Sequence, residues 1–172
     1  GASGTAQVSV NVGVSTQDLE AHWQLDETDG TTAADGTGNG NNAELRGDPA
    51  WTTGKVGGAL AFDGAGDYAA IRNMHYSQAA EIERVTVAFW MKAGENLDRT
   101  SIVDFDRSEY WSVGMNFHLE EGGEGRISWD TTNPSREIDD MNSTVRVDDN
   151  QWHHVVVVYD ANAVNDKKIY ID

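Results

Sequence analysis

Apolar and polar residues alternate with a period of two along much of the chain, and this pattern constrains the fold more than any other feature. In residues 85–91 and 111–117 every second residue is apolar, so the apolar side chains of each segment lie on one face, as in half-buried strands. Residues 154–159 contain four consecutive valines, a run that a central strand tolerates when both of its faces are covered. Shorter segments of the same character, separated by Gly, Asn and Asp, are residues 7–12, 22–25, 59–62, 68–71, 101–105, 126–129, 143–147 and 168–171. Many short strands divided by turn residues predict an all-β sandwich.

The charge balance excludes several classes of partner. Twelve Lys and Arg residues stand against 29 Asp and Glu residues, which gives a net charge of -17. Such a chain repels phosphate backbones and anionic lipid headgroups, so we expect neither nucleic acid nor a membrane surface as a partner. The absence of Cys excludes disulfides, thiolate zinc sites and cysteine nucleophiles. These features suit a bacterial protein that is secreted or displayed at the cell surface, where dissolved cations screen its self-repulsion, and an acidic cytosolic protein is the alternative.

Several short motifs occur in a fixed order along the chain. They are AHWQLDE at residues 21–27, DGTGNGN at 35–41, GKVGGALAFDG at 54–64, DY at 67–68, FW at 89–90 and QWHHV at 151–155. In this order they resemble the bacterial laminin G-like domains of the concanavalin A-like lectin and glucanase superfamily, from about residue 20 to residue 172. The resemblance implies a concanavalin A-like jelly-roll sandwich of two antiparallel sheets, which agrees with the fold class expected from the strand pattern.

The same resemblance divides the chain into three parts. Residues 1–4 look like a cloning remnant. Residues 5–16 contain a strand that is similar to the last strand of a preceding immunoglobulin- or cadherin-like module. The laminin G-like sandwich is expected over residues 17–172. Domains of this kind usually continue with further strands, so we expect the sandwich to be incomplete at its C-terminal side and to be completed by a neighbouring domain or a second chain.

The loop at residues 35–42 is the candidate metal site. Its spaced oxygen side chains, and glycines that let backbone carbonyls converge, suit Ca²⁺, which takes six to eight oxygen ligands. The resembled domains commonly hold a structural calcium here, which makes Asp35, Asn39 and Asn41 the predicted ligands. The alternative is a turn that closes on its own backbone without a metal.

Carbohydrate recognition needs an aromatic ring to cover the apolar face of a sugar and fixed polar groups to read its hydroxyls. Residues 104–111, with the sequence DFDRSEYW, and the loop that follows residue 129 supply such groups. The predicted glycan-binding residues are Asp104, Asp106, Arg107, Tyr110, Trp111 and Trp129. For Trp111 and Trp129 a core role is the alternative, because both lie at strand ends. Trp23, Trp90 and Trp152 lie within strands and are assigned to the core.

A catalytic role is not expected. Residues 137–142, with the sequence EIDDMN, resemble the Glu-x-Asp-x-x-Glu strand of sandwich-fold β-glucanases, but Asn142 replaces the final Glu that would donate the proton. The sequence therefore predicts a non-catalytic, calcium-stabilised module that binds a glycan or polysaccharide or acts in adhesion. One alternative is a structural scaffold in a large adhesin with no ligand of its own, and another is a glucanase-like hydrolase.

Overall fold

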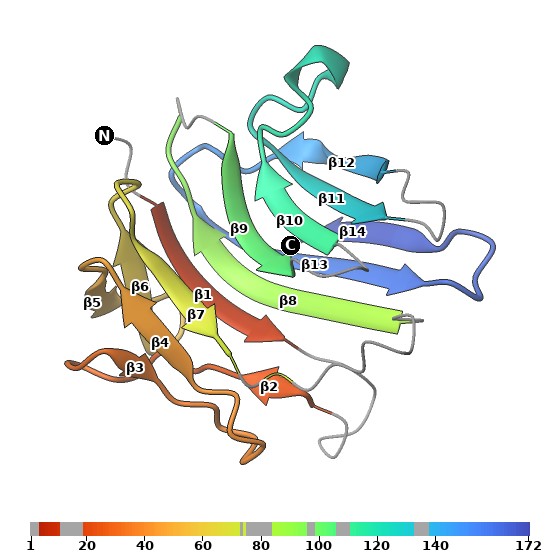
Figure 1. Cartoon of the computed structure of the whole chain (residues 1–172). Helices are drawn as coiled ribbons and strands as arrows, with labels where there is room; N and C mark the ends of the chain where they lie inside the picture. Colours follow the sequence, from red (N-terminus) through yellow and green to blue (C-terminus); the bar gives the residue numbers. More distant parts are fainter. Residues whose placement is uncertain are drawn as a thin grey trace.

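The described part of the protein is a sandwich of β-sheets with a single 3₁₀ turn, as the computed structural model in Figure 1 shows. The structure describes residues 4–10, 19–72, 74, 84–95, 99–105, 111–132 and 138–172. Among these residues no helix is long and apolar enough to cross a membrane. The described elements are β1 (Gly4–Val10), β2 (Ala21–His22), β3 (Thr32–Ala33), β4 (Ala43–Arg46), β5 (Ala50–Thr53), β6 (Gly58–Phe62), β7 (Tyr68–Ile71), β8 (Arg84–Lys92), β9 (Thr100–Phe105), β10 (Trp111–Met115), the 3₁₀ turn η1 (Leu119–Glu121), β11 (Arg126–Thr132), β12 (Ile138–Arg146), β13 (Trp152–Asp160) and β14 (Lys167–Ile171).

The strands form three antiparallel sheets in two layers. One layer is a seven-stranded sheet of order β14-β13-β8-β1-β6-β5, with β2 paired to β1. The other layer consists of a four-stranded sheet of order β12-β11-β10-β9 and a three-stranded sheet of order β3-β4-β7. These two smaller sheets lie side by side in front of the large sheet in Figure 1. The all-β sandwich expected from the sequence is confirmed, with one of its two layers divided into two sheets.

The core lies between the two layers and follows the predicted alternation. In β8 every second residue from Val85 to Met91 is buried, and in β13 the residues that alternate with the outward-facing ones are buried in the same way. The indole Nε1 of Trp129 in β11 donates to the carbonyl of Val158 in β13 at 3.2 Å, which joins the layers through a hydrogen bond. The least exposed large side chains of the core are Trp129, Phe89, Leu60, Met115, Ile127, Val87, Val113, Val147, Val155 and Val157.

The N-terminal strand has a different role from the one expected. The sequence assigned residues 5–16 to a segment from a preceding module, whereas β1 lies inside the large sheet and pairs with both β6 and β8. The expected boundary between residues 16 and 17 therefore does not separate this strand from the sandwich.

The alternation predicted for residues 111–117 ends two residues early. Asn116 has a φ of 61°, in the left-handed region, so the chain leaves β10 there. Phe117 turns back over Gly114 on the face opposite the core, where a Cβ on Gly114 would overlap its ring. The Arg99 guanidinium lies 4.8 Å from the centre of the same ring. Phe117 therefore covers the outer face of the four-stranded sheet, although the sequence pattern placed it in the core.

Candidate functional site

A cavity of about 480 Å³ lies between the three-stranded and four-stranded sheets. Its lining includes β7 on one side, β9 on the other, and core side chains such as Leu60 and Met91 from the large sheet. Most of the lining is apolar, but Asp67, Tyr68 and Asp104 also contribute. Tyr68 is 53% exposed, so its ring lies where the cavity opens to solvent. The cavity therefore combines apolar walls, an accessible aromatic ring and two carboxylates.

A row of polar side chains continues from Asp104 across the outer face of the four-stranded sheet. Asp104 in β9, Ser112 in β10, Asp130 in β11 and Asp140 in β12 occupy directly opposed register positions. The Ser112 hydroxyl donates to the Asp104 carboxylate. Ser112 and Asp130 are buried, whereas Asp104 and Asp140 are exposed. The row links the cavity to a polar cluster further across the sheet.

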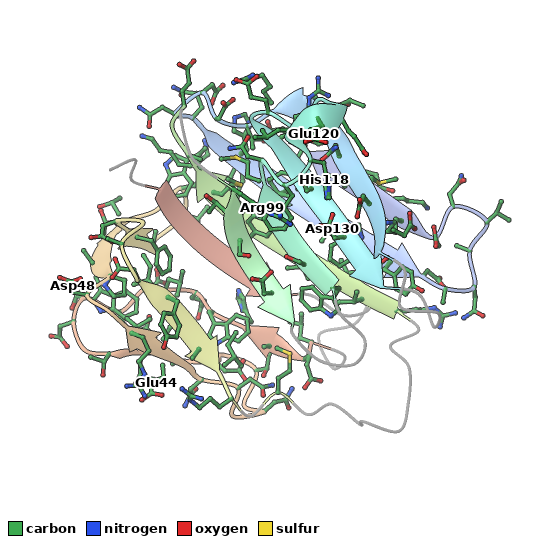
Figure 2. All side chains as sticks on the ribbon, turned by 45° about the horizontal axis from the view of Figure 1, so that its top comes forward. Glu44, Asp48, Arg99, His118, Glu120 and Asp130 are labelled. Carbon is green, nitrogen blue, oxygen red and sulfur yellow. The ribbon has the colours of Figure 1, made fainter. Side chains whose placement is uncertain are left out.

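His118 holds two carboxylates of this row together. Figure 2 shows His118 and Asp130 close together over the sheet, and His118 Nε2 lies 3.0 and 3.1 Å from the two Asp130 oxygens. His118 Nδ1 lies 3.5 Å from an Asp140 oxygen. Burial raises the pKa of Asp130, the charge of Asp140 raises it further, and the hydrogen bond from His118 acts in the opposite direction. A doubly protonated imidazole can donate to both carboxylates, so His118 is able to offset their repulsion.

Within the described part of the chain, two groups of side chains have the composition of a metal site. Ligand atoms of His118, Asp130 and Asp140 lie within 4.8 Å of one another, and so do those of Asp48, Asp63 and Asp67. In the second group, the Asp67 carboxylate accepts from the backbone N–H groups of Asp48 and Asp63, which lowers its pKa. That carboxylate closes two turns through hydrogen bonds to the backbone.

The predicted glycan-binding residues fall in three different places. Asp104 lies on the cavity wall and at the start of the polar row, as described above. Asp106, Arg107 and Tyr110 lie outside the described residues. Trp111 and Trp129 face the core, with exposures of 7% and 0%, and their rings meet edge to face at 5.6 Å. The prediction that these two tryptophans form a sugar platform is wrong, because neither presents a ring face to solvent.

Tyr68 and His118 were not predicted as site residues. Tyr68 belongs to the DY motif at residues 67–68, which contributed to the family resemblance but did not indicate a role in ligand binding. His118 follows the polar positions that alternate with Trp111, Val113 and Met115, and that alternation was the signal that a polar outer face existed.

The predicted calcium loop is organised around Asp35. One Asp35 oxygen accepts from the backbone N–H groups of His22 and Thr37, each at 3.0 Å, and the other accepts from the backbone N–H of Asn41 at 3.1 Å. The Thr37 hydroxyl lies 2.8 and 2.7 Å from these two oxygens. Burial raises the pKa of Asp35, but these hydrogen bonds outweigh it and lower the pKa overall. In this conformation the carboxylate faces N–H and O–H donors, so it fits the role of a loop organiser better than that of a metal ligand.

Asn41 and Asn39 occupy different environments in the same loop. Asn39 is exposed, and its amide nitrogen donates to the carbonyls of Leu19 and Glu20. Asn41 is 1% exposed, its amide nitrogen donates to the Glu20 carbonyl, and its backbone carbonyl accepts from the Trp23 indole at 2.8 Å. The Asn41 side-chain oxygen is buried without a hydrogen-bond donor. This oxygen fits a cation, because a buried acceptor without a donor is costly and a metal would satisfy it.

Residues 138–142 adopt the strand expected for the glucanase-like motif. Asp140 and Asn142 share the outer face, opposite Asp130 and Ser128, and Asn142 Oδ1 accepts from the Ser128 hydroxyl at 2.8 Å. Asp139 points to the other face and pairs with the buried Lys167 at 3.0 Å. Position 142 therefore lies on the outer face beside the polar row, where the glucanase motif would supply another carboxyl group, but its side chain is an amide that accepts from a serine.

The comparison with protein families decides the identity of this sandwich. The family model described as the concanavalin A-like lectin/glucanases superfamily, of laminin G type, matches residues 63–172. The chain belongs to this laminin G-like family. The matched segment contains β7 to β14, and so includes the outer polar row and most of the core that supports it. The comparison with curated proteins finds no match.

Two solved structures share the laminin G-like fold of this chain. The binding domain of Paraclostridial Mosquitocidal Protein 1 has a TM-score of 0.59 and 13% identity, over 96% of this chain and 38% of that one. The receptor binding domain of botulinum neurotoxin D has a TM-score of 0.53 and 19% identity, over 81% of this chain and 35% of that one. The chain therefore spans well under half the length of either solved chain. At these identities the likeness concerns the fold alone.

Proposed function

We propose that this laminin G-like chain is a non-catalytic carbohydrate-binding or adhesion module, and that a glycan enters the cavity between β7 and β9. The observation that carries the proposal is the position of Asp104, which lines the cavity and begins the polar row on the sheet. A volume of about 480 Å³ is within the range of known ligand pockets. Apolar walls suit the carbon face of a sugar, Tyr68 offers a ring for stacking, and Asp67 and Asp104 offer acceptors for hydroxyl groups.

The comparisons support binding more than catalysis. Both solved structures are described as binding domains, of a mosquitocidal protein and of a botulinum neurotoxin. Retaining glucanases need a second carboxyl group near the nucleophile to protonate the leaving group. Here Asn142 stands where the glucanase motif has its final Glu, and the Asp130 side chain is only 3% exposed and lies within hydrogen-bond distance of His118. This arrangement favours a role in binding.

The test is a glycan titration with matched variants. Asp104→Asn and Tyr68→Ala change two residues of the cavity, and Val145→Ala changes a residue of β12 that is 51% exposed and is not part of the cavity lining. A broad array of neutral glycans, with millimolar Ca²⁺, should identify a ligand whose affinity falls by about tenfold in Tyr68→Ala and is unchanged in Val145→Ala. Equal affinities in all four proteins would place the site elsewhere.

A scaffold without a ligand is the second candidate, and one observation favours it. Among the described strands, β7 pairs with β4 on one side and β9 pairs with β10 on one side, and the cavity lies between them. An additional strand from a neighbouring domain or a second chain would fit such a gap, since exposed strand edges invite pairing. If no glycan on the array binds the folded protein, the scaffold function replaces glycan binding as the proposed function.

The calcium part of the proposal rests on the buried oxygen of Asn41. A cation that binds only the native state stabilises it by about 2.7 kcal/mol at a hundredfold excess over Kd. Thermal melts in millimolar Ca²⁺ and in chelator should therefore differ by several degrees, and Asn41→Ser should remove the difference. Identical melting temperatures of the unmodified protein in both buffers would show that it has no stabilising calcium site.

Secretion or display at a bacterial surface completes the proposal. The net charge of -17 and the absence of Cys support it, because abundant external cations would screen the acidic surface. Immunolabelling of intact source cells is the direct test, and labelling only after lysis would contradict surface display.

A further inference from the structure

The outer face of the seven-stranded sheet carries aromatic side chains that the sequence assigned to the core. In β8 the buried residues are Val85, Val87, Phe89 and Met91, so Trp90 and Lys92 point away from the core. In β13 the alternation turns Trp152 and His154 outward in the same way. None of these four outward residues is buried, and Tyr170 in β14 is 54% exposed.

The strand register brings these side chains together. Trp90 lies opposite His154, and Lys92 lies opposite Trp152. The Trp90 and His154 rings are 5.0 Å apart and inclined at 41°. In the next row of the sheet, Ala88, Val156 and Tyr170 are direct neighbours across β8, β13 and β14. Tyr170 therefore lies in the row next to that of Trp90 and His154, beside the short side chains of Ala88 and Val156.

Lysines surround this aromatic face. The chain has four lysines, at positions 55, 92, 167 and 168. Lys167 is buried, but Lys55 lies over the Trp90 ring with its Nζ 5.4 Å from the ring centre. Lys92 lies beside Trp90, and Lys168 is exposed beside Tyr170. In a chain with 29 acidic residues, three of the four lysines thus gather around one set of rings.

Two carboxylates near this face, those of Asp160 and Asp172, already have partners. Asp160 pairs with Arg84 at 3.1 Å. Asp172 accepts from the backbone N–H of His154 at 2.9 Å and lies 2.8 Å from Nδ1 of His153. These contacts offset the negative charges that would otherwise oppose an anionic ligand here.

We propose that the face formed by Trp90, Trp152, His154 and Tyr170, with Lys55, Lys92 and Lys168, binds an anionic polysaccharide. Sugar rings stack on exposed aromatic side chains, and lysine ammonium groups pair with carboxylate or sulfate substituents on the same chain. A sheet face is open along its length, so it accommodates several consecutive sugar units. The acidic remainder of the protein repels the same polymer and restricts it to this face. Lys92 also belongs to the lining of the cavity, but the other residues of this face do not, and the proposal does not depend on the function proposed for the cavity.

The experiment is affinity electrophoresis of the folded protein in gels that contain polygalacturonate, chondroitin sulfate or neutral dextran. At about 0.05 M NaCl we expect retardation by at least one of the two anionic polymers and none by dextran. Lys55→Gln combined with Lys168→Gln should lower the affinity about threefold to tenfold, since each exposed ion pair contributes up to about 1 kcal/mol. Tyr170→Ala should lower it by a similar factor through lost stacking.

The controls separate this site from general charge effects and from the cavity. Arg72→Gln removes one positive charge from an exposed residue near Glu44, and it should bind like the unmodified protein. Asp104→Asn should also leave anionic binding unchanged, while the lysine variant should leave neutral-glycan binding unchanged. The proposal is overturned if neither anionic polymer retards the protein, or if the lysine and tyrosine variants bind normally. It is equally overturned if phosphatidylserine vesicles or single-stranded DNA bind with the same dependence on the lysines, because that would indicate nonspecific ion exchange.

Discussion

Replacing Trp129 by Ala should destabilise the sandwich more than any change on its surface. The side chain is fully buried, its ring meets Trp111 at 5.6 Å, and its Nε1 donates to the Val158 carbonyl of the opposite layer. Truncating a buried Trp costs about 3–5 kcal/mol. The edge-to-face pair adds about 0.5–1.5 kcal/mol to such contacts, and the lost hydrogen bond to Val158 costs about 1 kcal/mol more. We therefore expect a loss of about 5 kcal/mol, against a total stability of about 5–15 kcal/mol for a domain.

Urea unfolding followed by far-UV circular dichroism measures this loss without relying on tryptophan emission. Trp129→Phe keeps most of the buried ring but loses the N–H donor, so it should cost about 1–2 kcal/mol. Trp152→Ala is the matched control, because it removes the same side chain from the outer face and should cost about 1 kcal/mol. If Trp129→Ala costs no more than Trp152→Ala, the assignment of Trp129 to the link between the layers is wrong.

Three further results are expected from the electrostatics. Burial raises the pKa of Asp130 above the ordinary carboxyl pKa of 3.8. The protein should therefore lose stability relative to Asp130→Asn as the pH rises from 3.8 through the raised pKa. A difference in melting temperature between the two proteins that does not depend on pH would contradict this. Burial opposes the charged form of His153, but its hydrogen bonds with Asp172 and Asp149 outweigh burial and raise its pKa. The stabilisation relative to His153→Gln should therefore be complete below the ordinary pKa of 6.5 and disappear as the pH rises through the raised value. The melting temperature in chelator should rise as the NaCl concentration increases from about 0.01 M to about 0.1 M, because the Debye length falls from about 30 Å to about 10 Å. A steady fall of the melting temperature would show that repulsion among the carboxylates does not limit stability.

Local alternation predicted most of the described strands and their buried faces, but it missed β3, β4 and β5, which are only two to four residues long. The pattern in residues 85–91 placed Val85, Val87 and Phe89 on one face, and these residues are buried. The same alternation puts Trp90 on the opposite, outer face. The assignment of Trp90 to the core is therefore wrong, because it followed from the apolar character of the side chain and not from its position in the alternation. Phe117 was placed wrongly for another reason: the left-handed backbone at Asn116 ends the alternation, and nothing in the local sequence marked that residue as the end of the strand.

The candidate site was less predictable because it depends on contacts between distant segments. Asp104 was predicted from its neighbours in the chain, but its role follows from the register that aligns it with Ser112 and from the cavity beside β7. His118 reaches Asp130 and Asp140 only because the chain after β10 turns back over the sheet. Turn geometry and sheet order of this kind do not follow from the residues on either side.

The position of β1 sets an order for folding during synthesis. Thr5 lies opposite Ala61 on one side and opposite Lys92 on the other. At about 5–20 residues per second, the ribosome reaches Lys92 roughly 4–17 s after Thr5. Late in this interval, once β6 has been made, β1 can pair with it, but its other edge has no partner until β8 emerges. Because such long-range pairings form slowly and an open strand edge invites association with other chains, nascent chains should be most prone to aggregation before β8 is complete.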